Sequence, residues 1–381
     1  MSGPAIPLVD LQAQHREIAD EVMAGISRVM DSGAFILGAA VNEFEAAFAQ
    51  FCGVDHCVGV GNGTDALELM LRALDIGPGD EVIVPANTFI ATALAVVRAG
   101  ATPVLADCDD YHLIDPAQVE ARLTPRTRAL MPVHLYGQLA AMESLQTIAA
   151  AHHLALLEDA AQAQGAKRHG RCAGGHGIAA GTSFYPGKNL GAYGDAGAVL
   201  TSSGQIAERV RRLRNWGSDR KYHHPEIGFN SRLDTIQAVV LAAKLRRLEA
   251  WNEARRAAAA RYTQLLAGDD EVLAPQTMDG NDHVWHLYVV RVPRRDEILP
   301  RLQAAGIGVG VHYPTPLHLH GALRHLGYGA GDFPKAERAA GEILSLPLYP
   351  HLTATEQERV VATLRLALAA TRSPAAAAKN G

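Results

Sequence analysis

The stretch Gly181–Ala198 reads GTSFYPGKNLGAYGDAGA and sets one lysine, Lys188, among glycines and small residues, directly after the strand-like segment TSFY. A glycine-rich turn that excludes water solvates an ammonium group poorly, so we expect the pKa of Lys188 to fall and its amine to become a better nucleophile. The G-x-x-x-x-G-K-[ST] spacing is absent before this lysine, which argues against a P-loop. On this stretch alone, a lysine in a surface loop remains an alternative interpretation.

A second polar element follows an apolar run upstream of the lysine. The segment Leu154–Gly165, LALLEDAAQAQG, places Glu158 and Asp159 at the end of that run. If the run is a buried strand, Asp159 lies at the carboxyl edge of the sheet, where ligands of parallel sheets bind. A carboxylate in that place can keep a pyridinium nitrogen protonated, which makes pyridoxal 5′-phosphate (PLP) an electron sink. An N-cap aspartate for a following helix is the alternative interpretation.

A third element, Gly59–Leu71, reads GVGNGTDALELML, so that Gly-Asn-Gly-Thr follows a strand and opens a helix. Backbone N–H groups at such a helix start bind phosphate, and the helix dipole assists them. The three glycines stand at every second position, which does not fit the G-x-G-x-x-G pattern of dinucleotide-binding folds. A tight turn capped by Thr64 or Asp65 is the alternative interpretation.

The first ~245 residues alternate short apolar runs with amphipathic segments, an order that predicts a mostly parallel sheet with helices on both faces. The predicted strands are His56–Val60, Glu81–Pro85, Thr102–Leu105, Arg128–Val133 and Leu154–Glu158, and the predicted helices are Thr64–Leu74, Thr88–Ala99 and Ala141–His152.

A long helical pattern then runs from about Arg232 to Leu266, followed by a predicted strand, Asp282–Val292, a helix at EILPRLQAAG and the strand-like segment IGVGVHY. We therefore expect two domains: residues 1–250 form a large domain with an N-terminal helical segment, and residues 251–381 form a small α+β domain. The tail SPAAAAKNG is of low complexity, and we expect it to be frayed.

Composition narrows the class of protein. The chain has 381 residues, of which 48% are hydrophobic and 20% charged, and its formal net charge is -5. These values exclude a disordered chain and a small disulfide-stapled module, and the mild acidity argues against a nucleic-acid partner. The cysteines Cys52, Cys57, Cys108 and Cys172 suggest neither a disulfide framework nor a zinc site, and we expect no metal. With no secretory signal and no apolar stretch of ~18 residues, we expect a cytoplasmic protein without membrane contact.

The three elements together resemble the DegT/DnrJ/EryC1/StrS family of sugar aminotransferases. The resemblance covers nearly the whole chain, from IPLVDLQAQHREI to LSLPLYPHLT, and it is most specific in PANTFIATA, LEDAAQAQGA, SFYPGKNLGAYGDAGAV and IGFNSRLDTIQA. It implies the PLP-dependent transferase fold of type I, similar to aspartate aminotransferase, with a large sheet domain and a small C-terminal domain. It also implies a homodimer with shared active sites.

The resemblance assigns roles to individual residues. Lys188 is the Schiff-base lysine and proton shuttle, and Asp159 is the partner of the pyridine nitrogen. Phe89 stacks on the ring, and Gln162 lies near its phenolic oxygen. The implied phosphate contacts are Gly63, Thr64, Ser183 and, reaching the neighbouring subunit's cofactor, Asn230.

Sugar-nucleotide contacts are implied at further positions, namely Phe35, Tyr185, Tyr222, His312 and Tyr313. Arg220 and Lys221 could meet a diphosphate, but exposed basic residues are commonly just solvated. A structural histidine is the alternative interpretation for His312, and for His318 and His320 it is the favoured one.

The implied activity is ping-pong transamination, in which an amino group passes from an amino acid, expected to be L-glutamate, to a nucleotide-linked keto-sugar. The segment GAYGDAGAV resembles members that act on 3-keto sugars, so a dTDP-3-keto-deoxysugar is the expected substrate, with UDP-2-acetamido-3-keto and 4-keto sugars as alternatives. A PLP-dependent dehydratase is disfavoured because Lys188 stands where that subtype has histidine. A nicotinamide-dependent oxidoreductase is disfavoured by the glycine spacing, and a catalytically idle PLP-binding regulatory subunit by Lys188, Asp159 and Gln162.

Overall fold

The computed structural model describes residues 4–372, and the low-complexity tail lies outside the described residues. A seven-stranded sheet forms its centre, with strand order β1-β9-β8-β5-β4-β2-β3. Its strands are β1 (His56–Val60), β2 (Glu81–Pro85), β3 (Thr102–Ala106), β4 (Thr127–Leu130), β5 (Ala155–Asp159), β8 (Ala179–Ser183) and β9 (Gly197–Thr201). The pairs from β8 to β3 are parallel, and β9 runs antiparallel to both of its neighbours. The predicted mostly parallel α/β sheet is confirmed.

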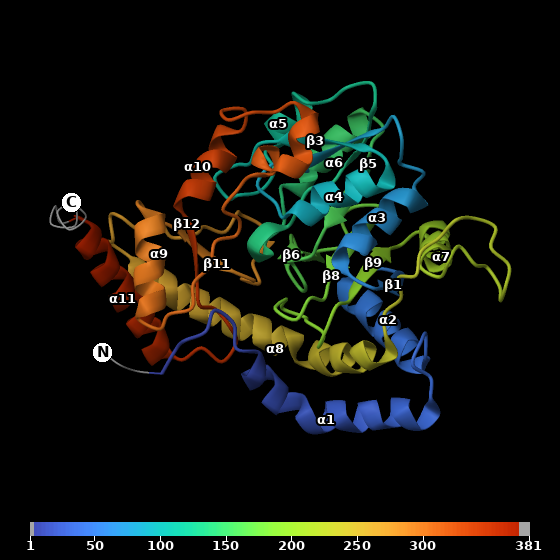
Figure 1. The fold of residues 1–381 in the computed structure, drawn as a ribbon, viewed down its shortest axis with the longest axis horizontal. Helices are drawn as coiled ribbons and strands as arrows, with labels where there is room; N and C mark the ends of the chain where they lie inside the picture. Colours follow the sequence, from blue (N-terminus) through green and yellow to red (C-terminus); the bar gives the residue numbers. More distant parts are fainter. Residues whose placement is uncertain (1–3, 373–381) are drawn as a thin grey trace.

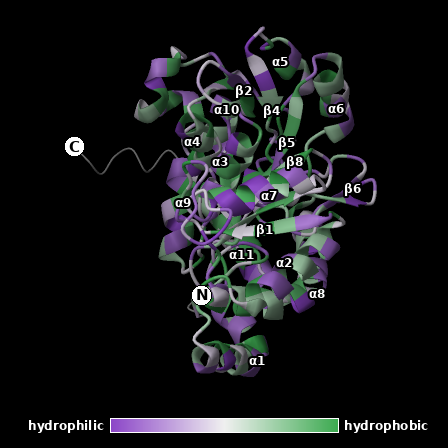
Figure 2. Ribbon diagram, turned by 90° about the vertical axis from the view of Figure 1, so that its right-hand side faces the viewer, coloured by the Kyte–Doolittle hydropathy of each residue, from purple (hydrophilic) through white to green (hydrophobic). Residues whose placement is uncertain are grey.

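Helices cover both faces of the sheet (Figure 1). The helices α3 (Gly63–Ala73), α4 (Ile90–Ala99) and α7 (Gly204–Leu213) share one apolar core with it. On the other face lie α5 (Pro116–Glu120), α6 (Met142–Ala151), α2 (Ala39–Cys52) and the first half of α8 (Thr235–Leu266). In Figure 2 the strands are mainly hydrophobic, and the hydrophilic residues of the helices lie toward the outside. Helix α1 (Leu11–Ser32) runs along α8, away from the sheet.

A separate apolar core gathers the C-terminal elements. It contains the second half of α8, β11 (Tyr288–Arg291), α9 (Arg295–Ala304), β12 (Ile343–Leu346) and α11 (Ala354–Arg372), beside α10 (Pro334–Glu342). Ile6, near the N-terminus, joins this core and bridges to Ile307. The division of the chain at residue 250 remains a prediction, because the unbroken helix α8 contributes to both the sheet core and this one.

The predicted strand Asp282–Val292 is wrong for most of its length, since only Tyr288–Arg291 and a two-residue strand at Asn281–Asp282 form. The residues between these two short strands belong to no sheet. Trp285 has a left-handed backbone (φ 48°), and the N–H groups of Val284 and Leu287 donate to the carbonyls of Gly137 and Tyr136. The segment IGVGVHY is likewise no regular strand, and it pairs only through single bridges. Both segments instead contact Tyr136, which follows β4: Leu287 N–H donates to its carbonyl, and its hydroxyl donates to His312 O.

The end of β5 carries two carboxylates that are both buried. Glu158, at 0% exposure, accepts hydrogen bonds from the backbone N–H groups of Gly174, His176 and Gly177 at 2.6–2.8 Å. His134 Nε2 lies 2.8 Å from the same carboxylate. Burial by itself raises the pKa of Glu158, but the His134 and backbone hydrogen bonds outweigh it and hold the pKa below its usual value. Glu158 therefore ties β5 to the loop that precedes β8.

We predict that Glu158→Gln lowers the free energy of unfolding by about 3 kcal/mol, because an amide cannot accept all of these hydrogen bonds and leaves buried donors unsatisfied. Glu208→Gln, which removes an exposed ion pair with Arg212, should cost less than about 0.5 kcal/mol. Urea unfolding at pH 7 measures both. Because the folded pKa of Glu158 is depressed, the Glu158→Gln deficit should shrink as pH falls below about 4.5. Equal losses in the two variants would contradict this assignment.

Candidate active site

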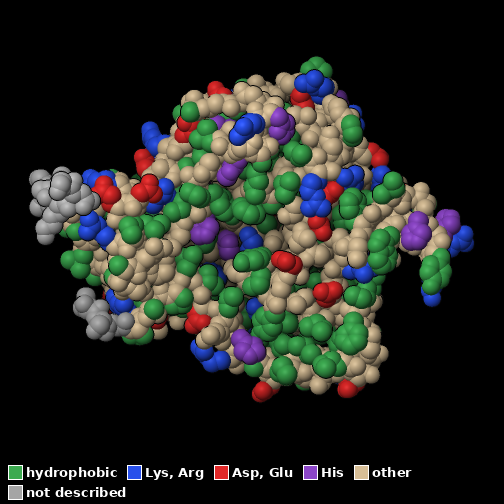
Figure 3. Space-filling view, in the orientation of Figure 1, with side chains coloured by type: hydrophobic (Ala, Val, Ile, Leu, Met, Phe, Trp, Pro, Cys, Tyr) green, Lys and Arg blue, Asp and Glu red, His purple; other side chains and the backbone are tan. Residues whose placement is uncertain are grey.

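A cavity of about 670 Å³ opens at the carboxyl ends of β5 and β8. It is closed on its other side by residues 286–287 and 312–313, which come from the two segments that fail to form regular strands. Figure 3 shows this face of the molecule hollowed between the sheet and the C-terminal elements, with basic and histidine side chains inside the hollow. Ten predicted site residues line the cavity: Gly63, Thr64, Phe89, Asp159, Gln162, Ser183, Tyr185, Lys188, His312 and Tyr313.

Asp159 is the last residue of β5 and is only 4% exposed. Its Oδ2 accepts a hydrogen bond of 2.8 Å from the Thr92 hydroxyl, and its Oδ1 accepts one of 3.1 Å from Ala161 N–H. Thr92 lies on α4 and has the Thr88 hydroxyl 3.0 Å from its own. Burial raises the pKa of Asp159, while the hydrogen bonds from Thr92 and Ala161 and the charge of Lys188 act in the opposite direction. No helix follows Asp159, so the N-cap alternative is wrong.

Lys188 stands in the turn between β8 and β9 and projects into the same cavity as Asp159. The turn is tight, because Lys188 N–H donates to Tyr185 O at 2.8 Å and a Cβ on Gly191 would lie 2.3 Å from Pro186 O. Burial lowers the pKa of Lys188 to about 8, and the nearby Asp159 carboxylate opposes that shift. The predicted depression of the lysine pKa is confirmed in direction. Near pH 8 the chain thus presents about half of this amine in its neutral, nucleophilic form.

The start of α3 faces the cavity beside Ser183. Asn62 caps the helix by accepting a hydrogen bond of 2.8 Å from Asp65 N–H, which leaves the N–H groups of Gly63 and Thr64 at the open helix end. A Cβ on Gly63 would lie 2.6 Å from Ser183 Cβ, so only glycine lets the helix start approach β8 this closely. This cradle of backbone N–H groups and a hydroxyl suits a phosphate dianion.

Aromatic rings and an amide line the space between these groups. The rings of Phe89 and Tyr313 are 5.2 Å apart, centroid to centroid, and Phe89 keeps half of its surface exposed. Gln162 donates from Nε2 to the Tyr313 hydroxyl at 3.1 Å and accepts from Tyr136 N–H at 2.7 Å. Burial raises the pKa of Tyr313 to about 12, so its hydroxyl stays protonated and can donate in turn.

Several cavity residues were not predicted from the sequence. Thr92 is one turn beyond Phe89 on α4, a spacing that could have found it because i and i+3 share a helix face. Leu8, Val9 and His286 come from segments far away in the chain, and no signal in a single sequence places them here.

Other predicted residues are not brought to this cavity. Phe35, Tyr222 and Asn230 are exposed and do not line it. Tyr222 is 86% exposed on the segment that projects at the right of Figure 1, together with Arg220 and Lys221.

His318 and His320, which the sequence favours as structural residues, both have polar partners within the chain. His318 is buried and lies 3.0 Å from Glu337 Oε1, and His320 Nε2 lies 3.2 Å from Thr315 O. The favoured interpretation of His318 and His320 as structural residues agrees with these contacts.

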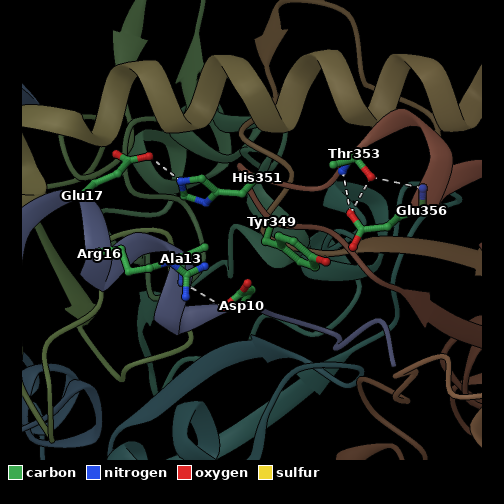
Figure 4. A pocket seen from close by; sticks show the side chains of 8 residues that line it. All are labelled: Asp10, Ala13, Arg16, Glu17, Tyr349, His351, Thr353 and Glu356. Carbon is green, nitrogen blue, oxygen red and sulfur yellow. Dashed lines mark hydrogen bonds and ion pairs between the residues drawn. The ribbon is translucent and has the colours of Figure 1, made fainter. Parts of the chain in front are cut away.

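A second hollow, of about 410 Å³, lies between α1 and the segment that leads into α11. Figure 4 shows Arg16 and Tyr349 beside it, with Glu17 bonded to His351 and Glu356 bonded to Thr353. Its three carboxylates all have hydrogen-bond partners within the chain, and it contains none of the predicted site residues. Within residues 4–372, no group of three or more acidic, histidine or cysteine side chains is arranged for a metal ion. No helix among these residues is long and apolar enough to cross a bilayer.

The fold and the cavity define a class of enzyme. A buried carboxylate, an amine of lowered pKa and a phosphate cradle face one another across a space with an aromatic wall, and each suits one part of PLP: the ring nitrogen, the aldehyde carbon and the phosphate. The Gly63–Ser183 approach, which a side chain would fill, leaves the cradle open to such a group. The site is that of a fold-type I PLP enzyme.

Comparison with known proteins identifies the family. The model of the DegT/DnrJ/EryC1/StrS aminotransferase family matches residues 16–365, so the chain belongs to this family and is a PLP-dependent sugar aminotransferase. The chain is 50% identical, over 95% of its length and 96% of the relative's, to the dTDP-3-amino-3,4,6-trideoxy-α-D-glucose transaminase of Streptomyces venezuelae. It is 45% identical to the UDP-N-acetyl-3-dehydro-α-D-glucosamine 3-aminotransferase of Acidithiobacillus ferrooxidans, over 96% and 98% of the two chains.

Among solved structures, the crystal structure of S. venezuelae DesV in complex with a ketimine intermediate has a TM-score of 0.93 to this chain and 49% identity, covering 96% of this chain and 98% of DesV. The predicted family, fold type and cofactor are confirmed. The roles of the individual site residues remain predictions.

We predict that Thr92→Val weakens PLP binding about tenfold, because it removes the hydroxyl that donates to Asp159 and so disfavours the charged carboxylate. Thr92→Ser keeps the hydroxyl and should bind PLP within about twofold of the wild type. Equilibrium titration of the cofactor-free proteins with PLP, followed by absorbance, compares the three. If Thr92→Ser weakens PLP binding while Thr92→Val leaves it unchanged, the effect comes from packing of the methyl group and not from the hydrogen bond.

Proposed function

We propose that this enzyme transfers the amino group of L-glutamate to carbon 3 of a dTDP-linked 3-keto-deoxysugar. The observation that carries the proposal is the meeting of Asp159, Lys188 and the start of α3 in one cavity, in a chain half identical to a transaminase named for a dTDP-3-amino sugar. The second relative is also named for a reaction at carbon 3, on a UDP-linked N-acetylated sugar, which makes that sugar class the alternative.

Each residue has a defined task in this proposal. When bound, PLP supplies an electron-withdrawing ring that takes up the electron pair left on the amino donor when its α-proton is removed. Lys188 Nζ takes that proton, and it returns a proton to the sugar carbon in the second half of the reaction. Asp159 keeps a proton on the ring nitrogen, and the buried hydrogen bonds from Thr92 and Ala161 fix its carboxylate in one orientation. Phe89 and Tyr313 form an aromatic wall beside these groups.

The first test follows the visible absorption of the purified protein. The wild type with PLP should show a visible band that L-glutamate removes and a dTDP-3-keto-deoxysugar restores, whereas Lys188→Ala should lack the covalent band and lose at least ~10³-fold in turnover, since proton transfer and covalent catalysis both depend on the amine. Parallel arms contain a UDP-2-acetamido-3-keto sugar and a dTDP-4-keto sugar. Recovery with only one of these would reassign the substrate, and no visible band after PLP addition would refute the cofactor role of the site.

We also propose that the enzyme is a homodimer with shared active sites. Asn230, Tyr222 and Phe35 are exposed and lie outside the cavity of their own chain, whereas the cavity mouth exposes Phe89 and Tyr185. A two-fold related copy would bring Asn230 to the phosphate end of its partner's cavity, and Tyr222, Arg220 and Lys221 to the sugar-nucleotide. In this arrangement, the predicted contact residues that lie outside the cavity of their own chain would reach the ligand bound in the partner's cavity.

Subunit mixing tests the shared site. Asn230→Asp places a negative charge against the cofactor phosphate and should inactivate the enzyme, as Lys188→Ala does. After joint refolding of the two variants at equal amounts, half of the dimers are mixed and each mixed dimer has one intact site, so about a quarter of the wild-type activity should return. A mixture no more active than its two components would place Asn230 and Lys188 in the same chain's site, or in none.

A further inference from the structure

A chain of buried amides runs from the backbone to the cavity, and it begins at Asn252 on α8. Asn252 Nδ2 donates to the backbone carbonyl of Gln164 at 3.0 Å, and a carbonyl can only accept. This contact fixes which end of the Asn252 amide is nitrogen. Its Oδ1 must therefore accept, and the Asn189 Nδ2 donates to it at 2.9 Å. Asn252 is 1% exposed and Asn189 2% exposed, so water does not compete for these hydrogen bonds.

The hydrogen bonds of Asn189 determine in turn which atom of His286 is the donor. Its second N–H donates to Val284 O at 3.0 Å, so both hydrogens on Nδ2 are used. The Asn189 Oδ1 can only accept, and it lies 3.1 Å from His286 Nδ1. His286 Nδ1 must then carry the hydrogen. In a neutral imidazole this leaves a lone pair on Nε2, so the network selects one tautomer of His286.

Nε2 of His286 faces the cavity. It has no hydrogen-bond partner in the part of the chain that the structure describes, and it is not among the unpartnered side-chain atoms sealed away from solvent there. His286 itself lines the cavity next to Lys188 and His312. Burial, and then the charge of Lys188, hold the pKa of His286 well below its usual value, so the ring stays neutral across the working pH range. His286 Nε2 is therefore a hydrogen-bond acceptor in the cavity, and it does not take up a proton and become a donor.

We propose that His286 is a positioning residue for Lys188, whose freed ammonium donates a hydrogen bond to His286 Nε2. Lys188 is adjacent to Asn189 in the sequence, so the same turn carries the amine of Lys188 and the amide that is hydrogen-bonded to His286. Among charged groups, Lys188 acts most strongly on His286. The inference rests on the proposed function, in which Lys188 leaves the cofactor carbon and takes up a proton. At that moment its ammonium is enclosed in a poorly hydrated cavity, where a fixed acceptor stabilises it.

The test uses the enzyme loaded with pyridoxamine phosphate, in which no lysine is bonded to the cofactor. With ¹³C-labelled lysine, the six lysines of the chain are followed by NMR against pH, and Lys188 is assigned from the signal that Lys188→Ala lacks. His286→Phe keeps a flat ring without an acceptor, and it should raise the acid dissociation constant of Lys188 about tenfold. His286→Gln keeps a donor for Asn189 beside an acceptor for Lys188, and should stay within about twofold of the wild type.

A second readout needs no substitution at His286. In ¹⁵N-histidine spectra of the wild type, His286 should be protonated at Nδ1 only, and its Nε2 signal should shift as Lys188 titrates; in Lys188→Ala that shift should vanish. Protonation at Nε2, or an unchanged Lys188 titration in His286→Phe, would overturn the proposal, even if the variant binds keto-sugar more weakly. Neither readout involves a sugar substrate, so a wrong substrate assignment and a wrong role for His286 give different results.

Discussion

Two consecutive buried carboxylates at the end of β5 are the constraint on which the rest of the site depends. Because alternate residues of a strand point to opposite faces, Glu158 and Asp159 need separate sets of partners. Glu158 takes His134 and the N–H groups of the loop before β8, which fixes that loop. Asp159 takes Thr92 from α4 and Ala161 N–H, which fixes the wall of the cavity. Leaving either carboxylate unpartnered would cost several kcal/mol, so neighbouring elements cannot move independently of β5.

The same constraint explains how one cavity can hold groups with opposite requirements. Burial makes the charged forms of Asp159 and Lys188 unfavourable and moves their pKa values toward each other. The hydrogen bonds from Thr92 and Ala161 and the charge of Lys188 oppose the rise in the pKa of Asp159. For Lys188 only the Asp159 carboxylate opposes burial, so the ammonium group loses its proton near pH 8. A carboxylate fixed by buried hydrogen bonds and an amine of lowered pKa are the pair that proton transfer to and from a PLP-bound substrate would need.

The residues predicted for the cofactor end belong to short segments marked by local pattern and by the family resemblance, and all but Asn230 line one cavity. The strand ends before Gly63 and Asp159 follow from apolar runs that stop at polar or glycine-rich turns, and Lys188 stands among glycines after the strand-like segment TSFY. The C-terminal contribution could not be predicted in the same way. The apolar, β-branched character of residues 282–292 predicts a strand, yet the left-handed backbone of Trp285 and hydrogen bonds to Tyr136 and Gly137 turn the chain toward the cavity. Those are long-range contacts, and local sequence pattern does not encode them.

The sugar end remains the least determined part of the site, and its surface explains why. At the cofactor end, Asp159, Gln162 and Asn189 are nearly sealed and their hydrogen bonds are satisfied within the chain. At the mouth, Tyr185 and Phe89 keep about half of their surface exposed, although both line the cavity. Exposing large aromatic rings at the rim of a pocket to water is unfavourable. A ligand or a second protein chain that covers the rings removes this free-energy cost. In the proposed dimer the partner would cover these rings, so the choice of sugar at the mouth would depend on groups from two chains.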